Sequence, residues 1–220
     1  MPDPNDLPIL SPAEARVLGS LAEKKELTPD VYPMTVNALQ SAANQKTSRE
    51  PVMALETVEI SRALGTLQHK ELVRQQFASR VERYEHLLAQ KFSLTQSQIA
   101  IIGLLLLRGP QTAHELLARS ERLARFQSIE QLRGDLDLLI GRRPPLVQLI
   151  ERGPGQREER YAQLLTGAVQ VVAAAAPASG ATLPYRPDLE ERVEALERQV
   201  AELAEKLRSL AGETASEPRN

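Results

Sequence analysis

The stretch RVERYEHLL at residues 80–88 returns later in the chain as REERYAQLL at residues 157–165. The same duplication is visible upstream, where LSPAE at residues 10–14 matches LTQSQ at residues 94–98. A chain that repeats itself at a spacing of this size consists of copies of one supersecondary unit, and the repeat has to be recognised before the fold is interpreted. We therefore expect two related units, one after the other, before residue 166.

Each unit opens with a signal for the start of a helix. Ser11 and Thr95 stand at N-cap positions, where a hydroxyl accepts a hydrogen bond from a free backbone amide. Glu14 and Gln98 follow three residues later and complete capping boxes. The sequence predicts helices over residues 11–25 and 95–108.

The rest of each unit predicts two more helices and a β-hairpin. Shorter polar helices are expected at 35–44 and 112–121, and each precedes an amphipathic helix whose apolar positions recur at helical spacing. Strand-like runs follow at 71–77, 81–87, 146–151 and 159–164, the last two separated by a Gly-Pro-Gly turn. The apolar positions are Ile60, Ala63, Leu64 and Leu67 in the first unit and Ile129, Leu132, Leu136, Leu139 and Ile140 in the second.

Three helices followed by a hairpin form the arrangement called a winged helix, in which helices two and three make the helix-turn-helix and the hairpin is the wing. The expected fold class is mostly α with small β-hairpins (α+β), built as two tandem winged-helix domains and a C-terminal coiled-coil helix. The expected divisions are a tail at 1–9, domains at 10–92 and 93–166, an Ala/Pro-rich linker at 167–187, a coiled-coil helix at 188–211 and a disordered tail at 212–220.

The C-terminal segment has the apolar spacing of a coiled coil, with valine or leucine at the a positions and leucine at every d position. This pattern favours a parallel two-stranded coil, and hence a homodimer. The alternative is one amphipathic helix that folds back on the domains. The dimerisation residues are Leu189, Val193, Leu196, Val200, Leu203, Leu207 and Leu210.

Composition excludes several classes of function. The chain has no cysteine and only three scattered histidines, so thiolate chemistry and a zinc centre are excluded. No catalytic motif, metal-ligand set or cofactor signature is present, and the expected enzyme activity, metal and cofactor are therefore none. The longest apolar run and the N-terminus fit neither a membrane span nor a signal peptide, which predicts a cytoplasmic protein without membrane contact.

The best candidate for nucleic-acid contact is the second helix of the first domain and its exit, together with the cations of the first wing. These residues combine amide donors with positive charge, as phosphate contact requires. The alternative is that the Asn and Gln side chains satisfy an irregular turn through hydrogen bonds to the backbone. The candidate residues are Thr35, Asn37, Asn44, Gln45, Lys46, Arg49, Arg62, Arg74, Arg80 and Arg83.

The outward faces of the two third helices are less suited to reading bases. The first would present Glu59, Arg62, Thr66 and His69, and the second Gln131, Gly134, Asp137 and Leu138. Carboxylates that face phosphates oppose binding, so the second domain is expected to be less suited to recognising DNA bases than the first.

Arg83-Tyr84 and Arg160-Tyr161 occupy matching wing positions. Stacking of these tyrosines on bases is one interpretation. The other is that each tyrosine packs its ring on the third helix while the arginine pairs with a neighbouring glutamate. The repetition of the pair in both copies favours the structural interpretation.

The segment YPMTVNAL at residues 32–39 and its continuation AANQKTSREPV at residues 42–52 resemble the YceH-type family of bacterial proteins, which carry a domain of unknown function. The resemblance extends over residues 10–165 and includes RYEH at 83–86. It implies a tandem winged-helix fold with a C-terminal coiled coil and implies no enzymatic activity.

Taken together, the sequence predicts a non-enzymatic protein that is DNA-associated or regulatory, with double-stranded DNA as partner and a homodimer as its assembly. The alternative is a scaffold that uses the winged-helix surfaces and the coiled coil to bind a protein partner, without DNA.

Overall fold

The computed structural model describes residues 7–76, 81–152 and 157–168. All of them belong to one compact unit, which ends at Ala174. The coiled coil expected at 188–211, nearly all of the linker and the candidate residue Arg80 lie outside the described residues. We call residues 7–92 the first half and residues 93–168 the second half.

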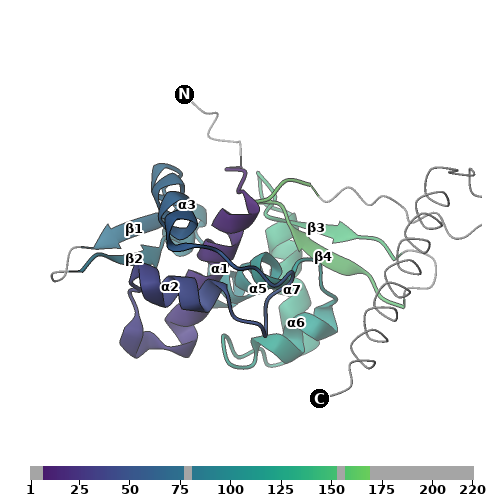
Figure 1. Cartoon of the computed structure of the whole chain (residues 1–220). Coiled ribbons are helices and arrows are strands. Elements are labelled where there is room, and N and C mark those ends of the chain that lie inside the picture. The colour runs from purple at the N-terminus through teal and green to yellow at the C-terminus, as the bar shows by residue number, and fades with distance from the viewer. Residues whose placement is uncertain (1–6, 77–80, 153–156, 169–220) are drawn as a thin grey trace, which may run out of the picture. The chain divides into compact units, whose positions relative to one another are not determined.

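The first half contains three main helices and a hairpin, in the order expected from the sequence (Figure 1). The hairpin strands are antiparallel, with Val73 opposite His86. Two short helices that were not expected are also present, one between α1 and α2 and one after the hairpin. The elements are α1 (Pro12–Leu27), η1 (Pro29–Val31), α2 (Val36–Ala43), α3 (Thr57–His69), β1 (Val73–Gln76), β2 (Arg83–His86) and α4 (Leu88–Phe92).

The second half repeats the same order, and its strands pair with Val147 opposite Gln163. The α+β fold class, helices with two small antiparallel hairpins, is confirmed. The elements are α5 (Gln96–Arg108), α6 (Ala113–Ser120), α7 (Ile129–Ile140), β3 (Val147–Ile150) and β4 (Arg160–Gln163).

The helix starts follow the local signals in the sequence. The hydroxyls of Ser11 and Thr95 accept from the amides of Glu14 and Gln98, and both capping boxes are complete. α3 begins at Thr57, ahead of its first buried residue, Ile60. The Glu56 amide donates to the Glu59 carboxylate at 2.8 Å, and the two residues form a capping box in which glutamate takes the place of serine.

The long helices α1 and α5 pack along each other at the centre of the unit. A Cβ atom at Gly19 of α1 would lie 2.9 Å from Leu107 Cγ, which is too close for a real contact. At Gly103 of α5, 84 residues later in the repeat, a Cβ atom would lie 3.4 Å from Ala22 Cβ. The repeated glycine therefore brings the two helices together, and the approach is tighter on the α1 side.

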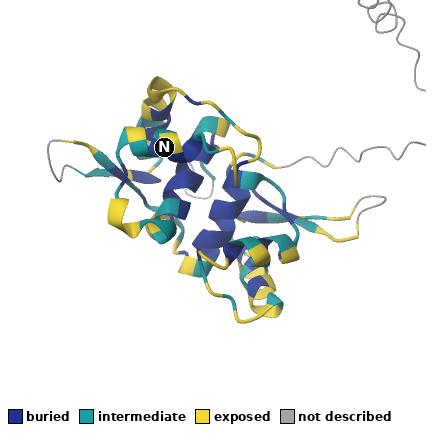
Figure 2. Ribbon diagram, turned by 60° about the horizontal axis from the view of Figure 1, so that its bottom comes forward, coloured by how far each residue is buried: buried dark blue, intermediate teal, exposed yellow. Residues whose placement is uncertain are grey.

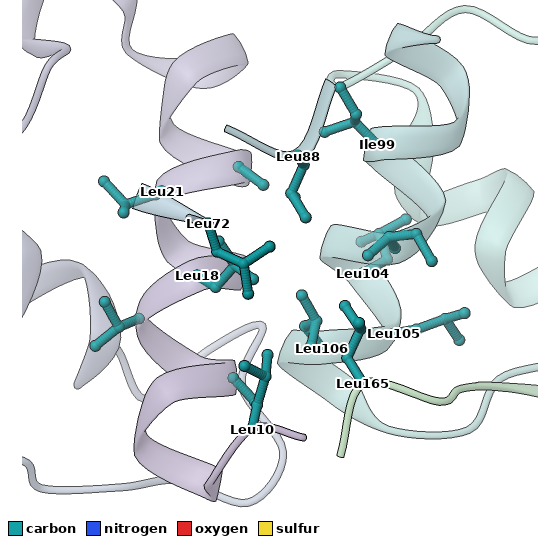
Figure 3. Close-up of a cluster of buried hydrophobic side chains, with 14 of the residues drawn as sticks. Leu10, Leu18, Leu21, Leu72, Leu88, Ile99, Leu104, Leu105, Leu106 and Leu165 are labelled. Atoms are coloured by element: carbon teal, nitrogen blue, oxygen red, sulfur yellow. The ribbon is translucent and has the colours of Figure 1, made fainter. Parts of the chain in front are cut away.

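The two halves share one hydrophobic core. Both central helices are largely buried (Figure 2). Figure 3 shows buried leucines of both halves in this core, among them Leu18 and Leu21 of α1, Leu88 of α4 and Leu104 and Leu105 of α5. Backbone hydrogen bonds also join the halves, from the Leu10 amide to the Leu165 carbonyl at 2.6 Å and from the Glu50 amide to the Leu107 carbonyl at 2.8 Å.

Candidate nucleic-acid interface

The third helix of each half keeps one face in the core and the other in solvent. The core residue Leu64 of α3 is 1% exposed, whereas Glu59, Arg62 and His69 are exposed. On α7 the exposed face includes Asp137. The outward residues of both helices are thus the ones expected from the apolar spacing.

The expectation that Arg49 contacts phosphate is wrong. Its residue is 2% exposed, and its guanidinium donates to both carboxylate oxygens of Glu23, at 3.1 and 2.6 Å. It also donates to the carbonyls of Ala42 and Ser48. A guanidinium that leaves water needs an anion and several acceptors, and α1 and the end of α2 supply them here. Arg49 is therefore a structural residue.

A second buried arginine, Arg16 of α1, holds the same segment of the chain. It is 2% exposed and donates to the carbonyls of Ala43, at 3.1 Å, and Pro51. Burial lowers the pKa of Arg16, and the positive charge of Arg49 lowers it further. The two arginines fix the connection between α2 and α3 against α1.

Asn44 and Thr35 also have structural roles. The Asn44 side chain donates to the Leu55 carbonyl at 2.9 Å and accepts from the Leu55 amide at 2.8 Å, so it closes the irregular connection. The Thr35 hydroxyl accepts from the Ala38 amide and caps α2. For Asn44 the alternative interpretation, hydrogen bonding to the backbone, is the one the structure supports.

The first hairpin is attached to the start of α2 through Arg83 and Tyr84. Arg83 donates to the Pro33 carbonyl at 2.8 Å, so its expected pairing with a neighbouring glutamate is wrong. Tyr84 is buried, exchanges backbone hydrogen bonds with Met34 and donates its hydroxyl to Glu82 at 2.9 Å. Burial and this hydrogen bond raise the pKa of Tyr84 to about 12. A ring held in this way cannot stack on a base.

The second hairpin is attached by the same contacts. Arg160 donates to the Pro110 carbonyl at 3.0 Å and forms an ion pair with Glu115 at 3.8 Å, so here the arginine does pair with a glutamate. Tyr161 donates its hydroxyl to Glu159 at 3.1 Å. Gln111 exchanges backbone hydrogen bonds with Tyr161, and burial again raises the tyrosine pKa to about 12.

Sequence reasoning missed the partner of this repeated Arg-Tyr pair, although the signal is present. Pro33-Met34-Thr35 and Pro110-Gln111-Thr112 are separated by 77 residues, the same spacing that separates the two Arg-Tyr pairs. Two segments that repeat at one spacing are candidates for contact with each other.

Few of the first-half candidates are free to meet a ligand. Asn37, Lys46 and Arg62 are exposed, and Gln45 is half-buried. The Arg74 side chain is 59% exposed but forms an ion pair with Glu85 at the surface of the hairpin. Among the described candidates, Lys46, Arg62 and Arg83 are the cations without an ion-pair partner, and the Arg83 side chain is held by the Pro33 carbonyl.

The second half contains a group of cations that sequence reasoning did not select. Arg133 of α7 and Arg152 and Arg157, which flank the tip of the second hairpin, line one hollow of about 520 Å³. Ala113, the first residue of α6, borders it, and so do the carboxylate residues Glu151, Glu158 and Glu159. The structure brings these arginines together and does not place any of the first-half candidates with them.

Composition carries a signal for this hollow. Residues 93–166 contain ten arginines and no lysine against eight acids, whereas residues 10–92 contain eleven cations of both kinds against ten acids. Arginine is the residue preferred for planar, two-pronged recognition of phosphate.

The histidines lie apart from one another. His69 is exposed and contacts the Gly65 carbonyl, and His114 contacts Glu158 at 3.1 Å. His86 is 3% exposed, and its Nδ1 accepts from the Leu88 amide. Burial and, to a smaller extent, the charge of Lys25 lower the pKa of His86 to about 4. Within the described ranges, no three His, Asp or Glu residues are grouped so that they could hold a metal ion.

In the part of the chain that the structure describes, no helix is long and apolar enough to cross a membrane. The architecture defines a mixed α+β protein in which one unit of three helices and a hairpin occurs twice. The chain belongs to the family described as "Protein of unknown function, DUF480", whose model matches residues 10–156.

Bacterial relatives extend the similarity to nearly the whole chain. A UPF0502 protein of Mesorhizobium japonicum is 69% identical over 207 residues, covering 94% of this chain and 99% of its own. A UPF0502 protein of Xanthomonas campestris pv. campestris is 53% identical over 208 residues, covering 92% and 93%. One from Stenotrophomonas maltophilia is 47% identical over 211 residues, covering 94% and 96%. The expected resemblance to an uncharacterised bacterial family is confirmed.

Proposed function

We propose that this protein is non-enzymatic and DNA-associated, and that its two halves act as tandem winged helices. Each half presents the outward face of its third helix beside a hairpin attached to its second helix, the arrangement winged helices use against a duplex. The observation that carries the proposal is that both halves present exposed cations without ion-pair partners among the described residues. They are Lys46 and Arg62 in the first half and Arg133, Arg152 and Arg157 in the second.

These charges suit contact with the phosphate backbone better than reading of bases. The outward faces also carry Glu59 and Asp137, and the whole chain has a formal net charge of −2. Acids near phosphates weaken binding, so attraction has to come from local clusters of cations. We therefore expect binding with weak sequence preference and marked sensitivity to salt.

The test is fluorescence anisotropy of a labelled mixed-sequence duplex with the full-length protein at about 50 and 200 mM salt. Four phosphate contacts correspond to a loss of roughly 100-fold in affinity between these concentrations. No binding at the lower salt would contradict the proposal.

A protein scaffold is the second candidate, and one observation favours it. Each third helix carries an exposed apolar residue, Val58 on α3 at 68% and Leu138 on α7 at 63%. Apolar groups in these positions suit a protein partner better than a phosphate backbone. If the duplex is not bound, loss of partner capture in the Val58→Ser and Leu138→Ser variants would support this function.

The proposed assembly is a homodimer formed by the heptads of residues 189–210. The argument is the sequence spacing alone. Residues 7–168 have a core of their own, so a chain ending at residue 168 is expected to fold and to be monomeric in light scattering, whereas the full chain is dimeric. A dimer of the shortened chain would place the interface elsewhere.

A further inference from the structure

Three arginines that are distant in sequence converge on the hollow of the second half. Arg133 comes from α7, Arg152 follows β3 and Arg157 precedes β4. All three are exposed, and none takes part in the ion pairs found among the described residues. Guanidinium groups that share a hollow without carboxylate partners repel one another, and an anion placed between them would remove that repulsion.

The carboxylates that border the hollow are mostly engaged elsewhere. Glu158 contacts the His114 ring at 3.1 Å, and Glu159 accepts the hydroxyl of Tyr161. Of the three bordering carboxylates, only Glu151 has no hydrogen-bond or ion-pair partner among the described residues. The three carboxylates balance the three arginines in formal charge, but none of them forms an ion pair with an arginine of the hollow, so all three guanidinium groups remain available to an anion.

The chemistry of the arginines specifies the kind of anion. A guanidinium presents parallel N–H donors in a planar fork, which matches two oxygens of one phosphate group. A hollow of about 520 Å³ lies within the range of sites that hold small molecules or parts of larger ones. The positive end of α6, at Ala113, borders it and adds to the attraction.

We infer that this hollow binds phosphate groups through Arg133, Arg152 and Arg157, and that their source is the DNA backbone, a step that rests on the proposed function. The second half, and not the first, then makes the main contact with the duplex. The hairpin arginines hold one side of the phosphate group and Arg133 the other, so the third helix and the wing act on the same stretch of backbone.

The experiment compares three sets of charge-removing variants in the full-length protein. The first is R133Q/R152Q/R157Q. The matched control is R122Q/R125Q/R143Q, which removes the same charge from exposed arginines of the same half that do not border this hollow. The third is K46Q/R62Q in the first half. Because all these residues are exposed, circular dichroism should show the same folded content in each.

Binding of a labelled mixed-sequence duplex is measured from about 50 to 200 mM salt. Each lost phosphate contact lowers the slope of log affinity against log salt by roughly 0.9, so the hollow variant should lose about 2 to 3 units of slope. We expect a loss of about one unit or less in the matched control and in K46Q/R62Q. Equal losses in the hollow variant and its control, or a larger loss in K46Q/R62Q, would overturn the inference and leave the proposed function standing.

A second measurement separates the inference from the proposed function. Isothermal titration with inorganic tripolyphosphate tests the hollow without DNA. If the wild-type protein binds tripolyphosphate and R133Q/R152Q/R157Q does not, the hollow is a phosphate site even when no duplex is bound, and the source is then a free phosphorylated molecule. If the wild-type protein binds neither tripolyphosphate nor the duplex, both the inference and the proposed function fail.

Discussion

The two halves share one arrangement of helices and hairpin but use their arginines differently. In the first half Arg16 of α1 and Arg49 of the α2–α3 connection are both buried, and Glu23 of α1 supplies the negative charge that pairs with Arg49. The positions of α5 that match Arg16 and Glu23, 84 residues later, are Ala100 and Leu107, and both are buried. Glu23 is the anion that pairs with the buried Arg49 guanidinium, and α5 offers no anion at the matching place.

The arginines of the second half therefore remain largely at the surface. Arg133, Arg152 and Arg157 are exposed beside the third helix and the wing. The comparison shows that one fold can direct arginine either to structure or to solvent, and that the residues on the first helix of each half decide which.

The largest expected effect concerns the buried pair of the first half. Arg49→Ala leaves Glu23 buried with Lys24, at 3.6 Å, as its remaining ion-pair partner, and the loss of one member of a buried pair typically costs about 3–5 kcal/mol of stability. The double variant E23L/R49M replaces both residues by apolar ones and gives α1 a leucine at the position that matches Leu107 of α5. It should restore at least half of the lost stability. Urea unfolding measures both, with Arg62→Ala as an exposed control that should change stability by less than about 0.5 kcal/mol. A double variant as unstable as Arg49→Ala would show that the ion pair is not the cause.

The next effect concerns His86, whose place in the second hairpin is taken by Gln163. The folded-state pKa of His86 is about 4, below its ordinary value of 6.5, because burial disfavours the charged ring. Protons therefore bind the unfolded chain first, and stability that is complete above pH 6.5 is lost as the pH falls from 6.5 toward 4. Between pH 7 and pH 4.5 this group should account for a loss of about 2–3 kcal/mol.

Urea unfolding of the wild type and of His86→Gln at pH 7 and pH 4.5 measures this loss. Carboxylates contribute equally to both proteins, so the difference between them reports His86 alone. The variant is expected to lose less stability than the wild type on acidification. The same loss in both proteins would show that His86 can be protonated inside the fold.

The smallest effect compares the two glycines where α1 meets α5. Alanine is favoured over glycine within a helix by about 1 kcal/mol. At Gly103 the added methyl group makes an ordinary contact with Ala22, so Gly103→Ala should be neutral or stabilising. At Gly19 it would meet Leu107 at 2.9 Å, and overpacking of this kind costs about 1–3 kcal/mol. Thermal unfolding should rank Gly19→Ala as the less stable variant, and the reverse order would contradict the closer approach at Gly19.

Much of the fold could be predicted because its signals are local. Capping residues such as Ser11 and Thr95, apolar residues at helical spacing and turn residues act within a few positions of one another. The duplication supported each prediction twice. α4 was missed because Leu88–Phe92 is too short to show a period, and the start of α3 was not predicted because glutamate takes the place of the usual capping residue.

The candidate site was predicted less well because exposure is not a local property. Lys46 and Arg49 lie three residues apart in one polar segment and are equally plausible from the sequence. The first is exposed and the second is buried, because Glu23, 26 positions away, lies where Arg49 meets α1.

The order of the elements and the duplication follow from the sequence alone. So do the helix starts that are marked by capping residues and the residues that form the core stripes. Only the tertiary structure decided that Arg49 belongs to the interior and that Arg133, Arg152 and Arg157 share one hollow. The reason is physical: the environment of a charge depends on which groups the fold brings within a few ångströms of it, and those groups come from distant parts of the chain.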